Sequence, residues 1–385
     1  MTAPMLFTKI TLRGLVLRNR VVVSPMCQYQ AIDGLVQDWH YAHHARFALG
    51  GVGAAMVEAT AVSTEGRITH GCTGLYDARH VPGLKRIADL YRAHGVAAGI
   101  QIGHAGRRAS CARPWEGAQP LTANGLEPAW QTVGPSPIPE RQGGPIPREL
   151  AKADIDGILV AFRRAFFRAL EAGFDTIEIH GAHGYLIHSF FSPHSNRRTD
   201  AYGGSLANRM RLPLQVAEVA REVWPKDRPI FYRASVVDGI DDGTTLADTV
   251  ALSKELKQRG VDVIDCSSGG MSGPATLSSK KIHPGFQVPL AEGVRRGAGI
   301  ATMAVGAILD GPQAEAILAG GKADLIAIGR EFMADPNWCL HAAEALELAN
   351  PFAVLPEQYA FYLERRAAVL ERNAESGDSL RSRKE

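Results

Sequence analysis

Two histidines and a tyrosine stand close together near the middle of the chain, in the run Phe-Asp-Thr-Ile-Glu-Ile-His-Gly-Ala-His-Gly-Tyr that ends at Tyr185. The apolar start of this run predicts a buried strand, and His180, His183 and Tyr185 follow at its end. Imidazole N–H groups donate hydrogen bonds to a substrate oxygen, and a phenol can deliver a proton. The cluster therefore predicts a catalytic site, with structural histidines or a metal pair as alternatives.

The metal interpretation is the weaker one. His43, His104 and Glu178 could supply further ligands, but the sequence contains no H-E-x-x-H pattern. Its 5 cysteines are dispersed without a C-x-x-C pair, which argues against a zinc site, an iron–sulfur cluster or a disulfide framework. We therefore expect no bound metal.

Other chemically able side chains stand where predicted strands end. Cys27 and Tyr29 follow Ser24-Pro25-Met26, and Gln101 lies near the end of another apolar run. A free cysteine is usually a small buried hydrophobe, but a place at a strand end, two residues before a tyrosine, favours a functional role. A buried glutamine needs partners for its donor and its acceptor, which a backbone group or the polar edge of a flat ring would supply. The small side chain of Ala59 would let such a ring approach the backbone.

Arg233 is an arginine inside an apolar run. A buried guanidinium without an anionic partner costs several kcal/mol, roughly. We expect either a structural ion pair with Glu58 or Glu178, or a ligand whose charge becomes negative during turnover.

The last two predicted strands end at Gly306 and Gly329, and Arg330 follows the second. Backbone N–H groups at glycines, together with a basic side chain, commonly bind phosphate at these two strand ends of a barrel. A tight turn is the alternative at Gly306, and residues 267–270 could also line the site.

Short apolar runs alternate along the chain with longer amphipathic segments. The runs predict eight strands, at 21–26, 54–62, 97–104, 176–180, 229–235, 261–267, 300–306 and 325–329. Helices are predicted at 39–49, 82–94, 154–172, 206–223, 246–259, 289–296 and 311–319. Eight strand–helix units, with no G-x-G-x-x-G after the first strand, predict an α/β fold, a (β/α)8 TIM barrel. A doubly wound sheet is the alternative.

We predict that residues 1–350 form a single barrel domain. Residues 107–150, rich in Pro and Gly, predict a long excursion after strand three, which we interpret as a lid over the site rather than a plain surface insertion. Residues 351–385 predict a C-terminal extension with a disordered end.

Composition excludes several classes of protein. The 385 residues are 45% hydrophobic and 21% charged, which suits a large globular core. A formal net charge of +2 does not suggest a nucleic-acid partner. The N-terminus lacks a signal-peptide pattern and no uncharged apolar run reaches about 18 residues, so we expect no membrane span and a cytoplasmic protein.

The combination of Cys27, Tyr29, Gln101, His180-x-x-His183-x-Tyr185 and Arg233 resembles the Old Yellow Enzyme family of FMN-dependent ene reductases, which have a (β/α)8 fold. Residues 190–209 are similar to the family's signature after the catalytic cluster, and the resemblance runs from about Phe7 to Trp338.

Cys27 and the His/His pair resemble the YqjM-like and xenobiotic reductase subgroup, where other branches often have threonine and His/Asn. Residues 113–117 resemble xenobiotic reductases in particular. Val305 departs from the tryptophan that some xenobiotic reductases place against the substrate, so their substrate preference does not carry over. Arg108 stands where related enzymes often have lysine, a change that would alter the contacts of the lid.

The resemblance implies tightly bound, non-covalent FMN, with its phosphate held by Gly306, Gly329 and Arg330. Ser24, Pro25, Met26, Cys27 and Gln101 would contact the flavin ring, with Ala59 packed near it. Arg233 would stabilise negative charge on the reduced ring, and Cys27 would tune the potential or the substrate fit.

The resemblance also implies a ping-pong cycle in which NADPH, or NADH, reduces FMN and leaves. His180 and His183, with Tyr29 nearby, would bind the carbonyl or nitro oxygen of an activated alkene. Hydride would pass from flavin N5 to the β-carbon, and Tyr185 would protonate the α-carbon. Nitroesters, nitroaromatics and quinones are alternative small-molecule substrates, and a non-flavin phosphate-binding barrel enzyme is the alternative class.

A homodimer or homotetramer is implied as well. In the subgroup that this chain resembles, a C-terminal residue of one subunit can reach a neighbour's site. Tyr359, Tyr362 and Arg365 are the candidates for that role here.

Overall fold

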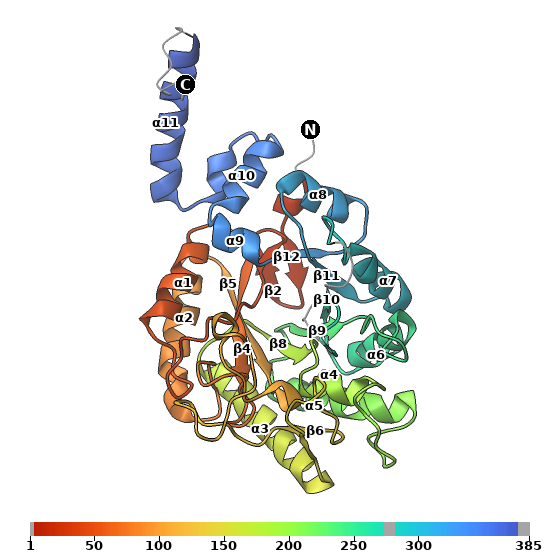
Figure 1. The fold of residues 1–385 in the computed structure, drawn as a ribbon. Helices are drawn as coiled ribbons and strands as arrows, with labels where there is room; N and C mark the ends of the chain where they lie inside the picture. The colour runs from red at the N-terminus through yellow and green to blue at the C-terminus, as the bar shows by residue number, and fades with distance from the viewer. Residues whose placement is uncertain (1–3, 273–281, 376–385) are drawn as a thin grey trace.

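The chain forms a closed barrel of eight parallel strands surrounded by helices (Figure 1). The computed structural model describes residues 4–272 and 282–375. Around the barrel the strands are β3 (Val21–Val23), β4 (Ala54–Ala61), β5 (Ala97–Gly103), β8 (Thr176–Gly181), β9 (Ile230–Ser235), β10 (Val263–Ser267), β11 (Ala301–Val305) and β12 (Leu325–Ile328). The predicted (β/α)8 fold is confirmed, and each strand lies within its predicted run to a few residues.

The barrel is covered by the helices that the apolar spacing predicted. They are α1 (Asp38–Ala48), α2 (Val81–Ala93), α3 (Lys152–Glu171), α5 (Leu206–Val223), α6 (Leu246–Gln258), α7 (Val288–Ala298) and α8 (Gly311–Ala319). Their apolar faces and the outward side chains of the strands form one large core. Among the residues described, no helix combines the length and apolarity needed to cross a membrane.

Strand β3 is shorter than predicted and ends at Val23. Its last ladder partners are Val23 with Ala55 and with Ile328, after which the backbone leaves the sheet. Pro25 has no N–H to donate to a ladder. The segment after Val23 is thereby released from the sheet and becomes part of the wall of a cavity.

A hairpin that the sequence analysis did not predict closes the other end of the barrel. Its strands are β1 (Ile10–Leu12) and β2 (Leu15–Leu17), paired antiparallel. Leu12 and Leu17 pack with Val22, Met56 and other inward side chains in a second, smaller core cluster. With that end filled by apolar side chains, polar chemistry is confined to the carboxyl ends of the strands.

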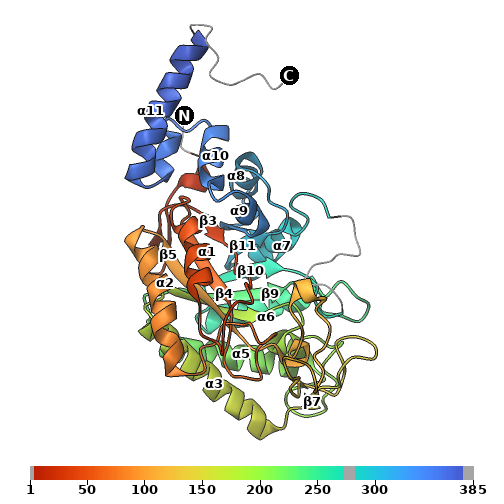
Figure 2. The same cartoon turned by 60° about the vertical axis from the view of Figure 1, so that its left-hand side comes forward.

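The excursion after β5 lies beside that carboxyl end (Figure 2). It contains the short 3-10 helices η3 (Gly106–Arg108) and η4 (Pro114–Glu116) and the two-residue strands β6 (Val133–Gly134) and β7 (Arg148–Glu149). The short helices α4 (Leu186–Phe191), after β8, and α9 (Arg330–Ala334), after β12, also lie at this end.

The chain continues after the barrel through α10 (Trp338–Ala345), η5 (Pro351–Val354) and α11 (Glu357–Glu375). Helix α11 extends away from the barrel in both views (Figures 1 and 2). The predicted disordered end, residues 376–385, lies outside the described residues. The division into a domain of residues 1–350 and an extension of residues 351–385 stays a prediction.

Candidate active site

The largest opening at the strand ends is a cavity of about 1100 Å³ that we call the main cavity. Its walls come from the ends of β3, β9, β10, β11 and β12 and from residues before α7. Of the predicted cofactor contacts, it collects Ser24, Pro25, Met26, Arg233, Gly306, Gly329 and Arg330, together with His183 and Ser267.

Two features suit the main cavity to a polar ligand. The Ser24 hydroxyl is buried and has no hydrogen-bond partner among the described residues. A buried hydroxyl without a partner is costly, so a ligand atom at this wall would complete its hydrogen bonding. At the end of β11, Gly306 has φ +112°, and a Cβ there would lie 2.5 Å from the Gln287 amide nitrogen, so the backbone at this wall needs glycine.

Arg233 is buried and forms an ion pair with Asp265, with Nε 3.2 Å from Oδ2. The predicted structural partners were Glu58 or Glu178, and that expectation is wrong. Asp265 stands opposite Arg233 in the β9–β10 register, so the adjacent strand supplies the anion. Glu58 instead accepts a hydrogen bond from the Gln28 backbone N–H at 2.7 Å.

Gln101 does not line the main cavity. Its Nε2 donates to Glu178 Oε1 at 2.7 Å, and both side chains are buried inside the barrel. The predicted partners of the Gln101 amide were a backbone group or the edge of a flat ring, but its N–H group donates to a carboxyl group instead. The acceptor oxygen of the amide is the atom left for a ligand.

The three side chains that define the cluster at the end of β8 do meet. The His180 ring lies 5.4 Å from the His183 ring and 4.9 Å from the Tyr185 ring, both edge to face. His183 Nε2 is 2.7 Å from Ser267 Oγ, and His180 Nδ1 is buried without a hydrogen-bond partner among the described residues. The backbone turns sharply here, because His183 has φ +60°.

Protonation at this cluster follows from burial. Burial, with the positive charge of Arg233, lowers the pKa of His180 and His183 well below the ordinary value. Burial raises the pKa of Tyr185. At neutral pH the site therefore presents two neutral imidazoles, each with one N–H, and one protonated phenol.

Two further groups hold this loop in place. His188 Nδ1 accepts the Gly184 N–H at 2.9 Å, and its Nε2 lies 2.8 Å from Asp238 Oδ1. Burial alone would raise the pKa of Asp238, but His188 and neighbouring donors lower it to about 2. Arg108 donates to the His183 carbonyl at 3.2 Å and lies over the Tyr185 ring, 5.9 Å from its centroid.

Cys27 is a free cysteine that follows Met26, a residue of the main-cavity wall. It hydrogen-bonds with the Tyr29 side chain and with the backbone at Ala59. Burial and the nearby Glu58 carboxylate raise the pKa of its thiol well above the ordinary value. A thiol that stays protonated is a poor nucleophile, which favours a tuning role over covalent chemistry.

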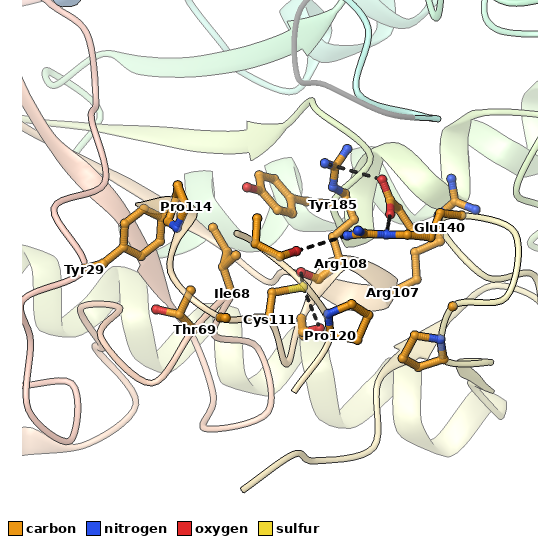
Figure 3. Close-up of a pocket in the computed structure, with 16 residues that line it drawn as sticks. Tyr29, Ile68, Thr69, Arg107, Arg108, Cys111, Pro114, Pro120, Glu140 and Tyr185 are labelled. Atoms are coloured by element: carbon orange, nitrogen blue, oxygen red, sulfur yellow. Dashed lines mark hydrogen bonds and ion pairs between the residues drawn. The ribbon is translucent and has the colours of Figure 1, made fainter. Parts of the chain in front are cut away.

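A second cavity of about 250 Å³ is lined by Ala59, His180 and Tyr185, and a third of about 740 Å³ by Tyr29 and Tyr185. Figure 3 shows the third cavity, with Tyr29 on one side, the excursion's Arg107, Arg108 and Glu140 on the other, and Tyr185 beside Arg108. Tyr185 therefore lines both the second and the third cavity. The excursion forms a wall of the third cavity.

Residues 113–117 lie directly beside this third cavity. Arg113 forms a two-pronged ion pair with Glu127, at 2.9 and 2.8 Å, and its Nε donates to the Tyr29 carbonyl. Trp115 packs edge-on against Tyr29 at 5.9 Å. These contacts fix Tyr29, whose φ of +53° is unusual for a tyrosine.

Several side chains of the site had no signal in the sequence that singled them out. Asp265 lies 32 residues from Arg233, and Glu140 lies 32 residues from Arg108. The Gln287 amide donates to the Val305 carbonyl, 18 residues away along the chain. Their roles depend on which strand ends are adjacent, and the barrel register supplies that information.

Comparison with known proteins identifies the family. The model of the NADH:flavin oxidoreductase / NADH oxidase family matches residues 5–349. The chain belongs to this family.

Relatives that align over most of their length support this assignment. The NADPH dehydrogenase of Geobacillus sp. (strain WCH70) is 45% identical over 344 residues, which cover 89% of this chain and 94% of the relative. The NADPH dehydrogenase of Listeria innocua serovar 6a is 44% identical over 357 residues, covering 92% and 98%.

Solved structures show the same barrel. Morphinone reductase superposes with a TM-score of 0.73 at 27% identity, covering 90% of each chain. A 2-naphthoyl-CoA reductase superposes with a TM-score of 0.78 at 25% identity over 91% of this chain, which spans about half of that enzyme, 53%. The expected Old Yellow Enzyme family is confirmed, while the YqjM-like subgroup stays a prediction.

Membership makes this protein an FMN-dependent oxidoreductase that uses NAD(P)H. The main cavity fits FMN, because an unpartnered buried hydroxyl, an arginine at the base and exposed Arg330 at the rim match its ring carbonyls and phosphate. Bound FMN would supply hydride chemistry, and these residues would hold it.

We expect Arg330→Ala to weaken FMN binding about ten- to hundredfold, the ratio typical of losing a hydrogen bond to a charged group. Fluorescence titration of flavin-free protein would measure the dissociation constant. Arg296→Ala is the matched control, because Arg296 is exposed on α7 and pairs with Glu292. Unchanged FMN affinity in Arg330→Ala would contradict the phosphate assignment.

Proposed function

We propose that the protein is an NAD(P)H-dependent ene reductase, which reduces the activated C=C bond of α,β-unsaturated carbonyl or nitro compounds. The observation that carries this proposal is the cluster of two neutral imidazoles and one protonated phenol on three edge-to-face rings. This set can bind a substrate oxygen and deliver one proton.

The residues would act in sequence on one bound substrate. His180 and His183 donate hydrogen bonds to the carbonyl or nitro oxygen and withdraw electron density from the conjugated C=C bond. FMN held in the main cavity would supply the hydride chemistry at the β-carbon, with NAD(P)H as the reductant of a ping-pong cycle. Tyr185 gives its proton to the α-carbon.

The excursion supports an alkene substrate by its position. Tyr29, Tyr185 and Cys111 line the third cavity, which places the phenol of Tyr185 in its wall. Arg107 closes one side through the carbonyls of residues 138 and 139. Quinones, nitroesters and nitroaromatics offer the same oxygen to the imidazoles and are the alternative substrates.

We also propose that the protein forms oligomers. We expect a homodimer or homotetramer, for which α11 offers the exposed aromatic side chains Tyr359, Phe361 and Tyr362. Arg365 stacks on Phe361, 3.5 Å from its ring centroid.

The test of the function uses the protein's own chromophore. Purified protein should be yellow, should bleach when NADPH is added without oxygen, and should regain its colour when cyclohexenone follows, with cyclohexanone as product. Bleaching without recovery by cyclohexenone, a quinone or a nitroalkene would contradict the ene-reductase function while leaving the flavin assignment intact.

A further inference from the structure

Four polar side chains meet inside the barrel, beneath the main cavity. They come from four consecutive strands: Gln101 on β5, Glu178 on β8, Arg233 on β9 and Asp265 on β10. Gln101 stands opposite Glu178 in one register, and Arg233 opposite Asp265 in another. All four are buried, and Glu178 and Asp265 are fully inaccessible to solvent.

Their contacts join the four into one chain. Gln101 Nε2 donates to Glu178 Oε1 at 2.7 Å, and Arg233 Nε lies 3.2 Å from Asp265 Oδ2. The Glu178 and Asp265 side chains lie within reach of each other, so a hydrogen bond between the two carboxyl groups would close the chain between these two contacts. Two carboxylates cannot form such a bond unless one of them carries a proton.

The charges lead to the same conclusion. Two carboxylates beside one guanidinium would leave one excess negative charge in a dry interior, where an unpaired ion is strongly disfavoured. Glu178 Oε2, Asp265 Oδ1 and Asp265 Oδ2 accept no hydrogen bond from the described residues, because the contact of Arg233 Nε with Asp265 Oδ2 is an ion pair without hydrogen-bond geometry. One proton removes the excess charge and supplies the missing donor.

We propose that Glu178 and Asp265 share a single proton, and that this acid pair is a positioning unit for Gln101 and Arg233. Through Glu178 the pair fixes the Gln101 amide nitrogen, so its oxygen faces the ligand. Through Asp265 it fixes the Arg233 Nε edge, so the outer guanidinium nitrogens face the main cavity. The positioning part rests on the proposed flavin contacts of Gln101 and Arg233.

The acidity of the two groups agrees with this geometry. Burial and the negative charge of Asp265 raise the pKa of Glu178 to about 8, while Arg233 opposes that rise. Burial also raises the pKa of Asp265 against the influence of Arg233. Arg233 is the cation facing the pair, and the Cys266 thiol, next to Asp265 on β10, stays protonated because burial raises its pKa.

Infrared difference spectroscopy tests the proton directly, in flavin-free and in FMN-loaded protein. Wild type minus Glu178→Gln should show the C=O stretching band of a protonated carboxylic acid, which shifts in D2O. Glu58 is a second buried carboxyl group whose pKa burial raises, so Glu58→Gln is the matched control and should leave the Glu178 band in place. If Glu178→Gln removes no such band in either form, the shared proton is disproved.

FMN affinity tests the positioning. Glu178→Gln can accept from Gln101 and donate to Asp265, so we expect FMN affinity within about threefold of wild type. Glu178→Leu breaks both contacts and should weaken FMN binding about ten- to hundredfold. If the Leu variant does not fold, Glu178→Met, or Gln101→Leu, which deletes the positioned amide, should give a loss of the same order.

The remaining outcomes also decide the matter. Equal FMN affinity in the Gln and Leu variants, or equal losses in both, would overturn the positioning role. The infrared band of flavin-free protein shows whether the shared proton is present, independently of the reaction that the enzyme catalyses. A protein that shows the band but fails to reduce cyclohexenone therefore refutes the proposed function alone.

Discussion

Replacing Tyr185 with phenylalanine should slow oxidation of the reduced enzyme by an enone about 100- to 10,000-fold, the usual contribution of a positioned proton donor. Reduction by NADPH should keep nearly its wild-type rate, since that step needs no proton from the phenol. Phenylalanine retains the ring that packs on His180 at 4.9 Å, so the change removes the hydroxyl alone. Because burial raises the pKa of Tyr185, the wild-type donor stays protonated throughout the neutral range.

Anaerobic stopped-flow absorbance separates the two steps. Tyr202→Phe is the matched control, because Tyr202 is a buried phenol that packs on Phe190 away from the three cavities. It should leave both rates close to wild type. An enone oxidation rate in Tyr185→Phe equal to that of the control would rule out the proton-donor role.

Removing one imidazole has the second large expected effect. His180→Ala should lower the rate of the enone step about 100- to 1000-fold, as deletion of one oxyanion donor typically does. The loss should appear mainly in kcat, because the hydrogen bond strengthens as negative charge develops on the substrate oxygen. NADPH reduction should be affected far less, since no such charge develops in that step.

An asparagine variant separates the loss of the His180 hydrogen bond from the loss of the side-chain volume. His180→Asn retains one N–H donor and should recover part of the rate that His180→Ala loses. His43→Ala controls for deletion of a buried imidazole, since His43 packs on Phe47 at 4.8 Å on α1, outside the three cavities. If alanine and asparagine at position 180 react equally fast, hydrogen bonding by His180 does not drive the reaction.

The sequence predicted the strands well because each barrel strand is a continuous apolar run between turn residues. The run of residues 54–62, for instance, contains a strand with seven of its eight residues buried. The hairpin β1–β2 was not predicted. Three-residue strands carry too little periodicity, and only its packing into the end of the barrel stabilises it.

At the site, the residues at the strand ends could be predicted from the sequence, but the side chains that pair with them could not. Barrel geometry brings residues at the carboxyl ends of strands to one face, so His183, Arg233 and Gly306 line one cavity as expected. The partner of Arg233 could not be predicted, because Glu58, Glu178 and Asp265 all stand on strands. Only the register places Asp265 beside it.

The left-handed backbone of His183, at φ +60°, limits which amino acids can occupy this position. Glycine adopts that conformation freely, asparagine, aspartate and histidine adopt it at modest cost, and β-branched residues are strained by it. Of these, only histidine and asparagine also present a neutral N–H to a substrate oxygen. The turn therefore favours histidine and asparagine as hydrogen-bond donors at position 183. Substitutions that change the substrate preference are therefore limited by the backbone conformation at position 183. His180 lies on regular strand backbone, which imposes no such limit.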